Sequence, residues 1–274
     1  MNRTRTLVTA GAIAAAMTLP LAPASAGDNH GKRSEGLAIG LVGGKALVAF
    51  DLSKPGRPLA GRKVSGLTGD TSLVGIDFRV QDERLYGVGN AGGVYTLSSK
   101  ARATKVSQLT VPLSGSRFGV DFNPAADRLR VVSDNGQNLR HDVNPGGATI
   151  ADGTLTYPPA TAAVIGVSAA AYTNNDLDTA TATTLFDLDT ALDQVALQAP
   201  ANAGSLSATG KLGVDAGSDA GFDIAGKDNK GYATLNVGGK YRLYSVSLLA
   251  GTVTSKGSFP GSVQVSDLAI PIGK

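Results

Sequence analysis

The sequence predicts an all-β protein, a five-bladed β-propeller whose C-terminal strand completes the N-terminal blade. Three observations support this fold. First, 36 Gly and 12 Pro stand against only seven Tyr, seven Phe and no Trp in 274 residues, a composition that favours short strands and tight turns over long helices. Second, one short strand motif recurs at a nearly constant spacing. Third, glycine-rich hairpin turns recur at matching places between these motifs.

The recurring motif has the form Gly-x-Asp followed by an aromatic or aliphatic residue. Three full copies and two looser ones follow one another along the chain: Gly75-Ile76-Asp77-Phe78, Gly119-Val120-Asp121-Phe122, Ala169-Ala170-Ala171-Tyr172, Gly221-Phe222-Asp223-Ile224 and Val265-Ser266-Asp267-Leu268. The Asp spacings are 121 − 77 = 44 and 267 − 223 = 44, and 223 − 121 = 102 spans two units. A period of about 45–50 residues is typical of propeller blades.

Each motif is followed by a second strand, a tight hairpin and a third strand. The expected hairpins are Val42-Gly43-Gly44-Lys45, Asn90-Ala91-Gly92-Gly93, Asp134-Asn135-Gly136-Gln137 and Val237-Gly238-Gly239-Lys240. Gly-Gly and Asn-Gly supply the positive φ angles that two-residue hairpin turns require. The expected third strands are 94–97, 139–142, 185–188 and 243–246.

The ends of the chain complement each other. The strands expected at 36–41 and 45–52 have no motif strand before them, and the last motif, 265–268, has no strands after it. We therefore expect the last strand to complete the first blade, which leaves no open sheet edge. A sixth blade would need a further unit, and an open solenoid would need capping repeats; neither is found.

The first 26 residues have the three parts of a secretory signal peptide. Arg3 and Arg5 precede an apolar run that Pro20 and Pro23 interrupt, and the small residues 24–26 form a cleavage site. The run is shorter than the roughly 20 residues of a membrane span. We expect a secreted, monomeric protein with a flexible start at 27–36, a single propeller domain over 37–274 and no membrane span after cleavage.

Composition argues against several functions. Removing residues 1–26 changes 25 basic and 22 acidic residues to 23 and 22, a net charge of +1, without the basic stripe of a nucleic-acid binder. The chain has no Cys and only two His and two Glu, which leaves little material for nucleophilic or imidazole catalysis. The one His on an expected strand, His141, is expected to make an ordinary hydrogen bond. We do not expect an enzyme.

Four motif aspartates, Asp77, Asp121, Asp223 and Asp267, are candidates for a shared site. First strands of propeller blades line the axis, where four carboxylates repel one another unless a cation, an arginine or a proton compensates. One interpretation is a Ca²⁺ site, because this ion prefers carboxylate and carbonyl oxygens. The favoured alternative is that each Asp accepts backbone hydrogen bonds within its own blade and that no cofactor is bound.

One hairpin departs from the repeat and carries the candidate ligand-binding residues, Arg128, Arg130, Gln137, Asn138 and Arg140. A two-residue turn at Asn135-Gly136 predicts that Arg130 faces His141 and that Val131 faces Arg140. Arginine suits bidentate capture of carboxylate, phosphate or sulfate groups. The alternative is that Arg128 and Arg130 pair with Asp121 or Asp127 between blades.

The same region carries a resemblance to a known family. The runs Phe118 to Pro124, Asp127 to Ser133 and Gly136-Gln137-Asn138-Leu139-Arg140, with Gly75 to Phe78 and Ala169 to Asn175, resemble a secreted bacterial family catalogued as domain of unknown function 4394. The resemblance covers roughly residues 37–270. It implies an exported, propeller-like domain and supplies no catalytic residues.

The sequence therefore favours a secreted, non-catalytic propeller that binds an extracellular ligand or partner, such as an anionic glycan or cell-envelope component, at one mouth of the ring. One alternative is a cation-dependent hydrolase or lyase that uses the axial Asp residues, since carboxylate pairs can act on sugars. A second alternative is a structural protein of the extracellular matrix or envelope.

Overall fold

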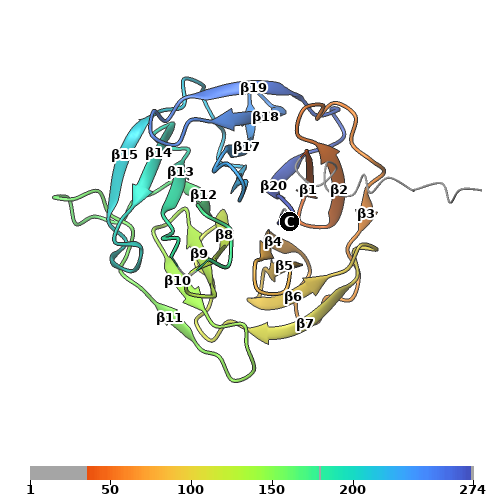
Figure 1. Ribbon diagram of the computed structural model, residues 1–274, viewed down its shortest axis with the longest axis horizontal. Helices are drawn as coiled ribbons and strands as arrows, with labels where there is room; N and C mark the ends of the chain where they lie inside the picture. Colours follow the sequence, from red (N-terminus) through yellow and green to blue (C-terminus); the bar gives the residue numbers. More distant parts are fainter. Residues whose placement is uncertain (1–35, 179, 273–274) are drawn as a thin grey trace, which may run out of the picture.

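The computed structural model describes residues 36–272 except residue 179, and it shows five four-stranded sheets arranged in a ring (Figure 1). From the axis outward, the first sheet contains β20 (Val265–Ala269), β1 (Leu37–Val42), β2 (Ala46–Asp51) and β3 (Arg62–Lys63). The second contains β4 (Leu73–Arg79), β5 (Arg84–Gly89), β6 (Gly93–Leu97) and β7 (Ala103–Gln108). The third contains β8 (Phe118–Asn123), β9 (Arg128–Ser133), β10 (Asn138–His141) and β11 (Thr149–Ala151).

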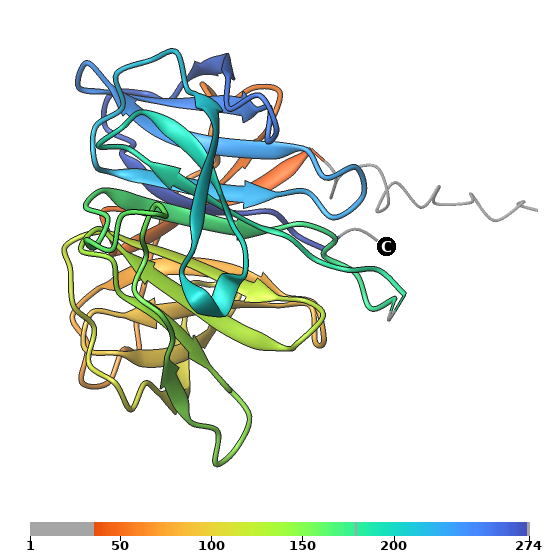
Figure 2. The ribbon, with the colours of Figure 1, turned by 90° about the vertical axis from the view of Figure 1, so that its left-hand side faces the viewer.

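The fourth sheet contains β12 (Val167–Tyr172), β13 (Leu185–Asp189), β14 (Gln194–Gln198) and β15 (Leu206–Lys211). The fifth contains β16 (Ala220–Ile224), β17 (Gly231–Val237), β18 (Lys240–Val246) and β19 (Val253–Ser258). A short 3₁₀-helix, η1 (Ala201–Ala203), precedes β15 on the outside of the ring (Figure 2). All five sheets are antiparallel, and the predicted five-bladed propeller is confirmed.

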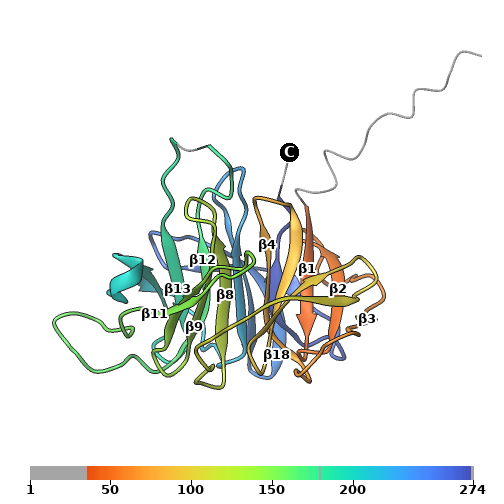
Figure 3. The ribbon, with the colours of Figure 1, turned by 90° about the horizontal axis from the view of Figure 1, so that it is seen from below.

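The ring closes through the two ends of the chain, as the sequence predicts. β20 pairs antiparallel with β1, so that Ile39 lies opposite Ala269 and Leu41 lies opposite Asp267. The start of β1 and the end of β20 therefore lie at the same face of the ring (Figure 3). The closure leaves no unpaired innermost strand, and this protects the sheet from edge-to-edge association.

The motif glycines allow the innermost strands to approach one another closely. A Cβ atom at Gly119 would lie 2.5 Å from the backbone nitrogen of Ala170 on β12, and one at Gly221 would lie 2.3 Å from the Cα of Asp267 on β20. A Cβ at Gly75 would lie 2.4 Å from the Val120 side chain on β8. The Gly of each full motif is therefore a packing requirement of the axis.

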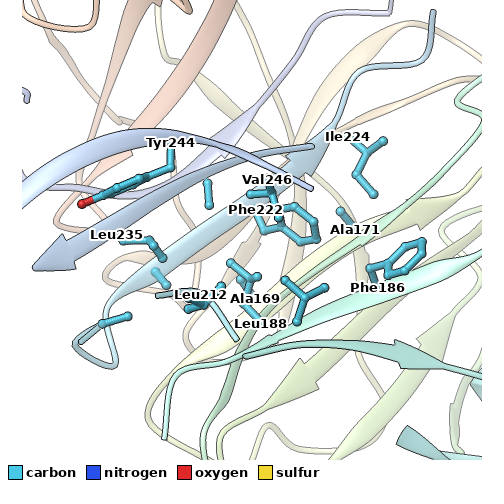
Figure 4. Close-up of a cluster of buried hydrophobic side chains, with 14 residues drawn as sticks. Ala169, Ala171, Phe186, Leu188, Leu212, Phe222, Ile224, Leu235, Tyr244 and Val246 are labelled. Carbon is cyan, nitrogen blue, oxygen red and sulfur yellow. The ribbon is translucent and has the colours of Figure 1, made fainter. Parts of the chain in front are cut away.

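Apolar side chains fill the space between neighbouring sheets. The described residues contain five buried hydrophobic clusters, and each joins two adjacent blades. Figure 4 shows the cluster between the fourth and fifth sheets, where Phe186 and Leu188 of β13 lie near Phe222 and Ile224 of β16. Alternation along each strand supplies one such face to each neighbour.

Two details of the predicted blades are wrong. Leu185–Leu188 belongs to β13, the second strand of its sheet, because the connection after Tyr172 is a long loop with no strand in it. The hairpin at Asn135-Gly136 has three turn residues, since Ser133 and Gln137 pair across it and Gly136 has a φ of 87°. The extra turn residue shifts the register by one.

The predicted signal peptide, residues 1–26, lies outside the described residues, as does the predicted flexible segment up to residue 35. Export stays a prediction. Within the part of the chain that the structure describes, no helix has the length and apolar character needed to cross a membrane.

Candidate functional site

The four motif aspartates lie at the axis and join neighbouring blades. All four are at most 5% exposed. One carboxylate oxygen of each accepts a hydrogen bond from the backbone of the next innermost strand: Asp77 from Phe122 (2.7 Å), Asp121 from Tyr172 (3.1 Å), Asp223 from Ile270 (2.5 Å) and Asp267 from Ile76 (2.8 Å). We predicted backbone bonds within the same blade, and Asp223 and Asp267 also make those. The bond that all four share runs between blades.

The fifth junction, between β12 and β16, lacks this aspartate because Ala171 occupies the position. Side chains beyond the strand end replace it. Asn174 and Asn229 exchange two hydrogen bonds, and the Asn175 amide donates to the Ile224 carbonyl at 3.0 Å. The aspartate of the motif is thus one of two ways in which this ring ties adjacent innermost strands together.

Burial changes the acidity of these carboxyl groups. It raises the pKa of Asp223 to about 7, and burial together with neighbouring carboxylates holds the pKa of Asp77 and Asp121 well above the usual aspartate range. Burial does the same to the pKa of Asp267. The desolvated carboxylate is the disfavoured form in each case.

Asp77, Asp121 and Asp223 can in principle hold a cation. One oxygen from each lies within 4.8 Å of the others. Ca²⁺ needs six to eight oxygen ligands, and hydrogen bonds to the backbone already occupy oxygens of all three residues. Asp267 lies outside this group. The carboxylates fit the chemistry of a hard cation, but their shared geometry is that of blade-to-blade contacts.

The candidate hairpin residues do not form one continuous surface. Arg130 is 2% exposed, and its guanidinium contacts Asp152 (2.8 Å), Asn138 (2.7 Å), Asn202 (2.7 Å) and the Tyr172 hydroxyl (3.1 Å). This network joins the third sheet to β12 and η1. Asn138 is buried with it.

The other two arginines of the hairpin also have acidic partners. Arg140 contacts Asp152 at 2.9 Å, and Arg128 contacts Asp142 at 3.0 Å. The sequence suggested that Arg128 and Arg130 pair with Asp121 or Asp127, but their acidic partners are Asp142 and Asp152. The side chains of Arg140 and Arg128 remain 33% and 38% exposed. Arg140 lies opposite Arg130, and His141 lies opposite Leu129, so the predicted pairing of Arg130 with His141 is wrong by one residue.

His141 is buried, and both of its ring nitrogens have partners. Nε2 lies 2.8 Å from the Ser107 hydroxyl, and Nδ1 lies 3.0 Å from the Thr149 hydroxyl. Burial lowers the pKa of this imidazole. Its contacts link β7, β10 and β11, which makes it a structural side chain of the second and third blades.

Gln137 connects the hairpin to one mouth of the ring. Its amide nitrogen donates to the Pro112 carbonyl (2.9 Å), and its amide oxygen accepts from the Ser114 backbone (2.9 Å). The neighbouring Asp134 accepts from the Ser116 backbone at 2.8 Å. The hairpin turn therefore orders the loop that precedes β8, and that loop lines the mouth.

This mouth contains a polar pocket of about 320 Å³, to which every blade contributes. It is lined by Gly43, Gly44, Ser72, Leu73, Val74, Ser116, Arg117, Phe118, Ser168, Asp219, Ala220 and Ser266. We call it the axial pocket. Its position follows from the repeat, because all innermost strands begin at the same face of the ring and the residues before each motif converge there (Figure 3).

Arg117 and Asp219 are the two charged side chains that line the described axial pocket, and they face each other at 3.7 Å. Asp219 also accepts a hydrogen bond from the Tyr241 hydroxyl. Burial, together with this contact to Asp219, raises the pKa of Tyr241 to about 12. Arg117 is 43% exposed. Because the contact with Asp219 is 3.7 Å long and the side chain is exposed, the Arg117 guanidinium is able to bind a second anion.

Sequence reasoning missed Arg117 and Asp219, although the repeat contained the signal. Each stands two residues before a motif glycine, Gly119 or Gly221. Equivalent positions in a propeller lie around the same opening, so opposite charges there predict a shared site. The hypothesis from the sequence concerns departures within the second and third strands, whereas these two residues precede the first strands.

A comparison with protein families decides the relationship. The model of the domain of unknown function DUF4394 matches residues 46–269. The chain belongs to this family. No curated protein matches the DUF4394 chain, so its function must be argued from its own residues.

Solved structures resemble this chain at low identity. A protein of unknown function from Bacteroides thetaiotaomicron is 17% identical (TM-score 0.47), with 79% of this chain and 56% of that chain covered. A chain of a nidogen/laminin complex is 10% identical (TM-score 0.49), with 86% of each covered. An auxiliary nutrient binding protein from the same Bacteroides species is 11% identical (TM-score 0.45), with 77% and 54% covered. The DUF4394 chain thus spans about half the length of some of these chains, and none indicates its ligand.

Proposed function

We propose that the protein is an exported, monomeric, non-catalytic binding propeller that takes an acidic sugar unit of a cell-envelope or extracellular glycan in the axial pocket. The observation that carries the proposal is the position of Arg117, the single basic side chain among the described lining residues, beside hydroxyl groups from several blades. Arginine matches a carboxylate in geometry and charge, and serine hydroxyls both donate and accept hydrogen bonds.

The size and polarity of the axial pocket support this ligand class. Its volume of about 320 Å³ is at the lower end of the range of about 300–1,000 Å³ for small-molecule sites. Ser72, Ser116 and Ser266 are at least partly exposed and supply hydroxyl groups, whereas Ser168 is buried against Thr190. A single hydrated sugar unit with one acidic group, at the end of a longer glycan, suits these walls better than a large apolar molecule.

The axial carboxylates favour binding over catalysis. Each has one oxygen committed to the backbone of the next blade, and none is more than 5% exposed. A general acid or base must come within hydrogen-bond reach of the proton that it transfers. Groups that are enclosed in this way hold the ring together and are poorly placed to contact a sugar.

The test is a calorimetric titration with tri-galacturonate and with its methyl ester, which lacks the charge. We expect the wild-type protein to bind the acid and Arg117→Ala to lose at least tenfold in affinity, which is about 1.4 kcal/mol. Arg140→Ala serves as the matched control, because Arg140 is similarly exposed but lies on the hairpin.

The opposite pattern would overturn the choice of site. If Arg140→Ala abolished binding and Arg117→Ala did not, the hairpin predicted from the sequence would be the ligand site. Absence of saturable binding to the wild-type protein would reject this class of ligand, and equal binding of the methyl ester would reject the role of charge.

A further inference from the structure

A second, larger cavity lies between the first and second blades. It has a volume of about 680 Å³, and its walls come from β1, β2 and β3 on one side and from β4, β5, β6 and β7 on the other. We call it the inter-blade cleft. It lies at the strand ends opposite the axial pocket, where β4 and β6 end and β5 begins.

The cleft exists because the outer strand of the first blade is short. β3 has only two residues and pairs only with Ala46 and Leu47. The segment before β3 contacts β2 through a backbone hydrogen bond in which the Leu59 N–H donates to the Ala49 carbonyl (2.8 Å). Beyond β3, Ser65 pairs with residues 101–103 of the second blade, and these contacts close the outer wall. The first and second sheets are therefore separated by a cleft next to the hydrophobic cluster that they share.

The floor of the cleft is apolar. Leu47, Leu85 and Leu97 belong to the hydrophobic cluster between these blades, and Ile39 and Phe78 pack against the same cluster. Leu59 lines the cleft with 65% of its surface exposed. Exposed large apolar side chains are ordinary when single. Here the leucine continues a buried apolar wall out to the solvent, which is the form of a site for an apolar body.

The rim of the cleft is basic. Arg62, Arg84 and Arg102 line it and are exposed, and Glu83 is the one acidic lining residue in the described chain, so the rim has a net charge of +3 − 1 = +2. The three arginines outnumber the acidic residue, and their side chains reach the solvent. An apolar floor beneath exposed guanidinium groups is complementary to a molecule with an apolar body and an anionic end.

We propose that the inter-blade cleft is a second ligand site that binds a monomeric long-chain carboxylate. The apolar chain occupies the floor formed by Leu47, Leu85 and Leu97. The carboxylate binds the guanidinium groups of Arg62 and Arg84 at the rim. The proposal is independent of the axial pocket, because the two cavities share no lining residue.

The size of the cleft agrees with this occupant. About 680 Å³ falls within the range of small-molecule sites and exceeds the axial pocket about twofold. Burial of apolar surface drives the binding of the chain, and the rim arginines set the preference for an anion.

The experiment is a titration of the full chain with laurate, at concentrations at which laurate is monomeric, and with the neutral analogue 1-dodecanol. We expect saturable binding of laurate, with dodecanol at least tenfold weaker. The double variant Arg62→Ala/Arg84→Ala loses at least tenfold in laurate affinity and does not change dodecanol binding. Lys240→Ala, which removes an exposed charge from the start of β18 in the fifth blade, serves as the control and binds laurate normally.

A cleft-filling variant tests the apolar floor separately. Ala49 lines the cleft from β2, and Ala49→Trp is expected to weaken laurate and dodecanol alike. No saturable binding of laurate to the wild-type protein would overturn the proposal. Equal laurate binding by the double arginine variant would also overturn it. Binding to phosphatidylglycerol vesicles without binding of monomeric laurate would instead assign the cleft to a membrane surface.

Discussion

The same residue types play different roles in this protein according to their surroundings. Arg130 is enclosed by Asp152, Asn138, Asn202 and Tyr172 and fastens two blades. Arg117 has a single distant acidic partner and faces a pocket. Composition and repeat position cannot separate a buried, fully bonded guanidinium from an available one. Whether an arginine is buried or available depends on which loop covers its side chain. For Arg130 this is the segment around η1, which supplies Asn202.

The axial aspartates predict a particular dependence of stability on pH. The folded-state pKa of Asp223 is about 7, and those of Asp77, Asp121 and Asp267 are also raised, whereas an unfolded Asp has a pKa of about 3.9. The folded protein therefore binds more protons between these values. The stabilisation that the four aspartates contribute to the free energy of unfolding is fully present below about pH 3.9. It is lost as the pH rises through their folded-state pKa values.

Thermal unfolding in EDTA between pH 5 and 8 measures this contribution. We expect the midpoint to fall as the pH rises, and we expect Asp121→Asn, which keeps the acceptor for Tyr172 but cannot ionise, to show a weaker dependence. A midpoint that rises with pH would contradict this account. A Ca²⁺-dependent rise at pH 8 that disappears in Asp121→Asn would support the cation site that the sequence offered as an alternative.

The innermost strands combine two devices at the scale of the element. The motif glycine removes the side chain where strands meet, and the aspartate two residues later bonds to the next strand. Gly119 and Gly221 are the sharpest cases, because an added Cβ would meet backbone atoms, of β12 at 2.5 Å and of β20 at 2.3 Å, rather than a side chain that could rotate away.

Gly119→Ala is therefore expected to lower the free energy of unfolding by about 1–3 kcal/mol, the usual cost of overpacking a tight core. Gly261→Ala is the control, since a Cβ there has no neighbour within 4 Å and its φ is not positive. Denaturant unfolding of the two variants makes the comparison. Equal stability of Gly119→Ala and the wild-type protein would refute the close-approach explanation.

The sequence predicts the repeated elements well and the irregular ones poorly. The motif spacing identifies every innermost strand, including the atypical β12, and it predicts that β20 joins β1. It fails at 185–188 because the fourth blade places its long loop after the first strand. The inter-blade cleft depends on the two-residue strand β3. The repeat motif marks the innermost strands and does not predict the length of an outer strand.

At the scale of the whole molecule, the ring divides its surface into two unlike faces. At one face the innermost strands begin and enclose the polar axial pocket. Towards the other face, the short first blade leaves the inter-blade cleft with its basic rim. Hydrogen bonds from backbone N–H groups to aspartate side chains tie adjacent blades near the axis. We therefore expect both cavities to be formed before a ligand binds, which lowers the cost of binding.

Mapping the ligand contact by NMR tests the central claim most directly. In ¹⁵N-labelled protein titrated with tri-galacturonate, we expect the largest chemical-shift changes at the amides of Ser116, Arg117, Phe118, Ala220 and Ser266, around the axial pocket, with the amides of the inter-blade cleft unchanged. Changes confined to the hairpin at 128–141, or to the cleft between the first two blades, would contradict the claim that the mouth of the ring is the binding site.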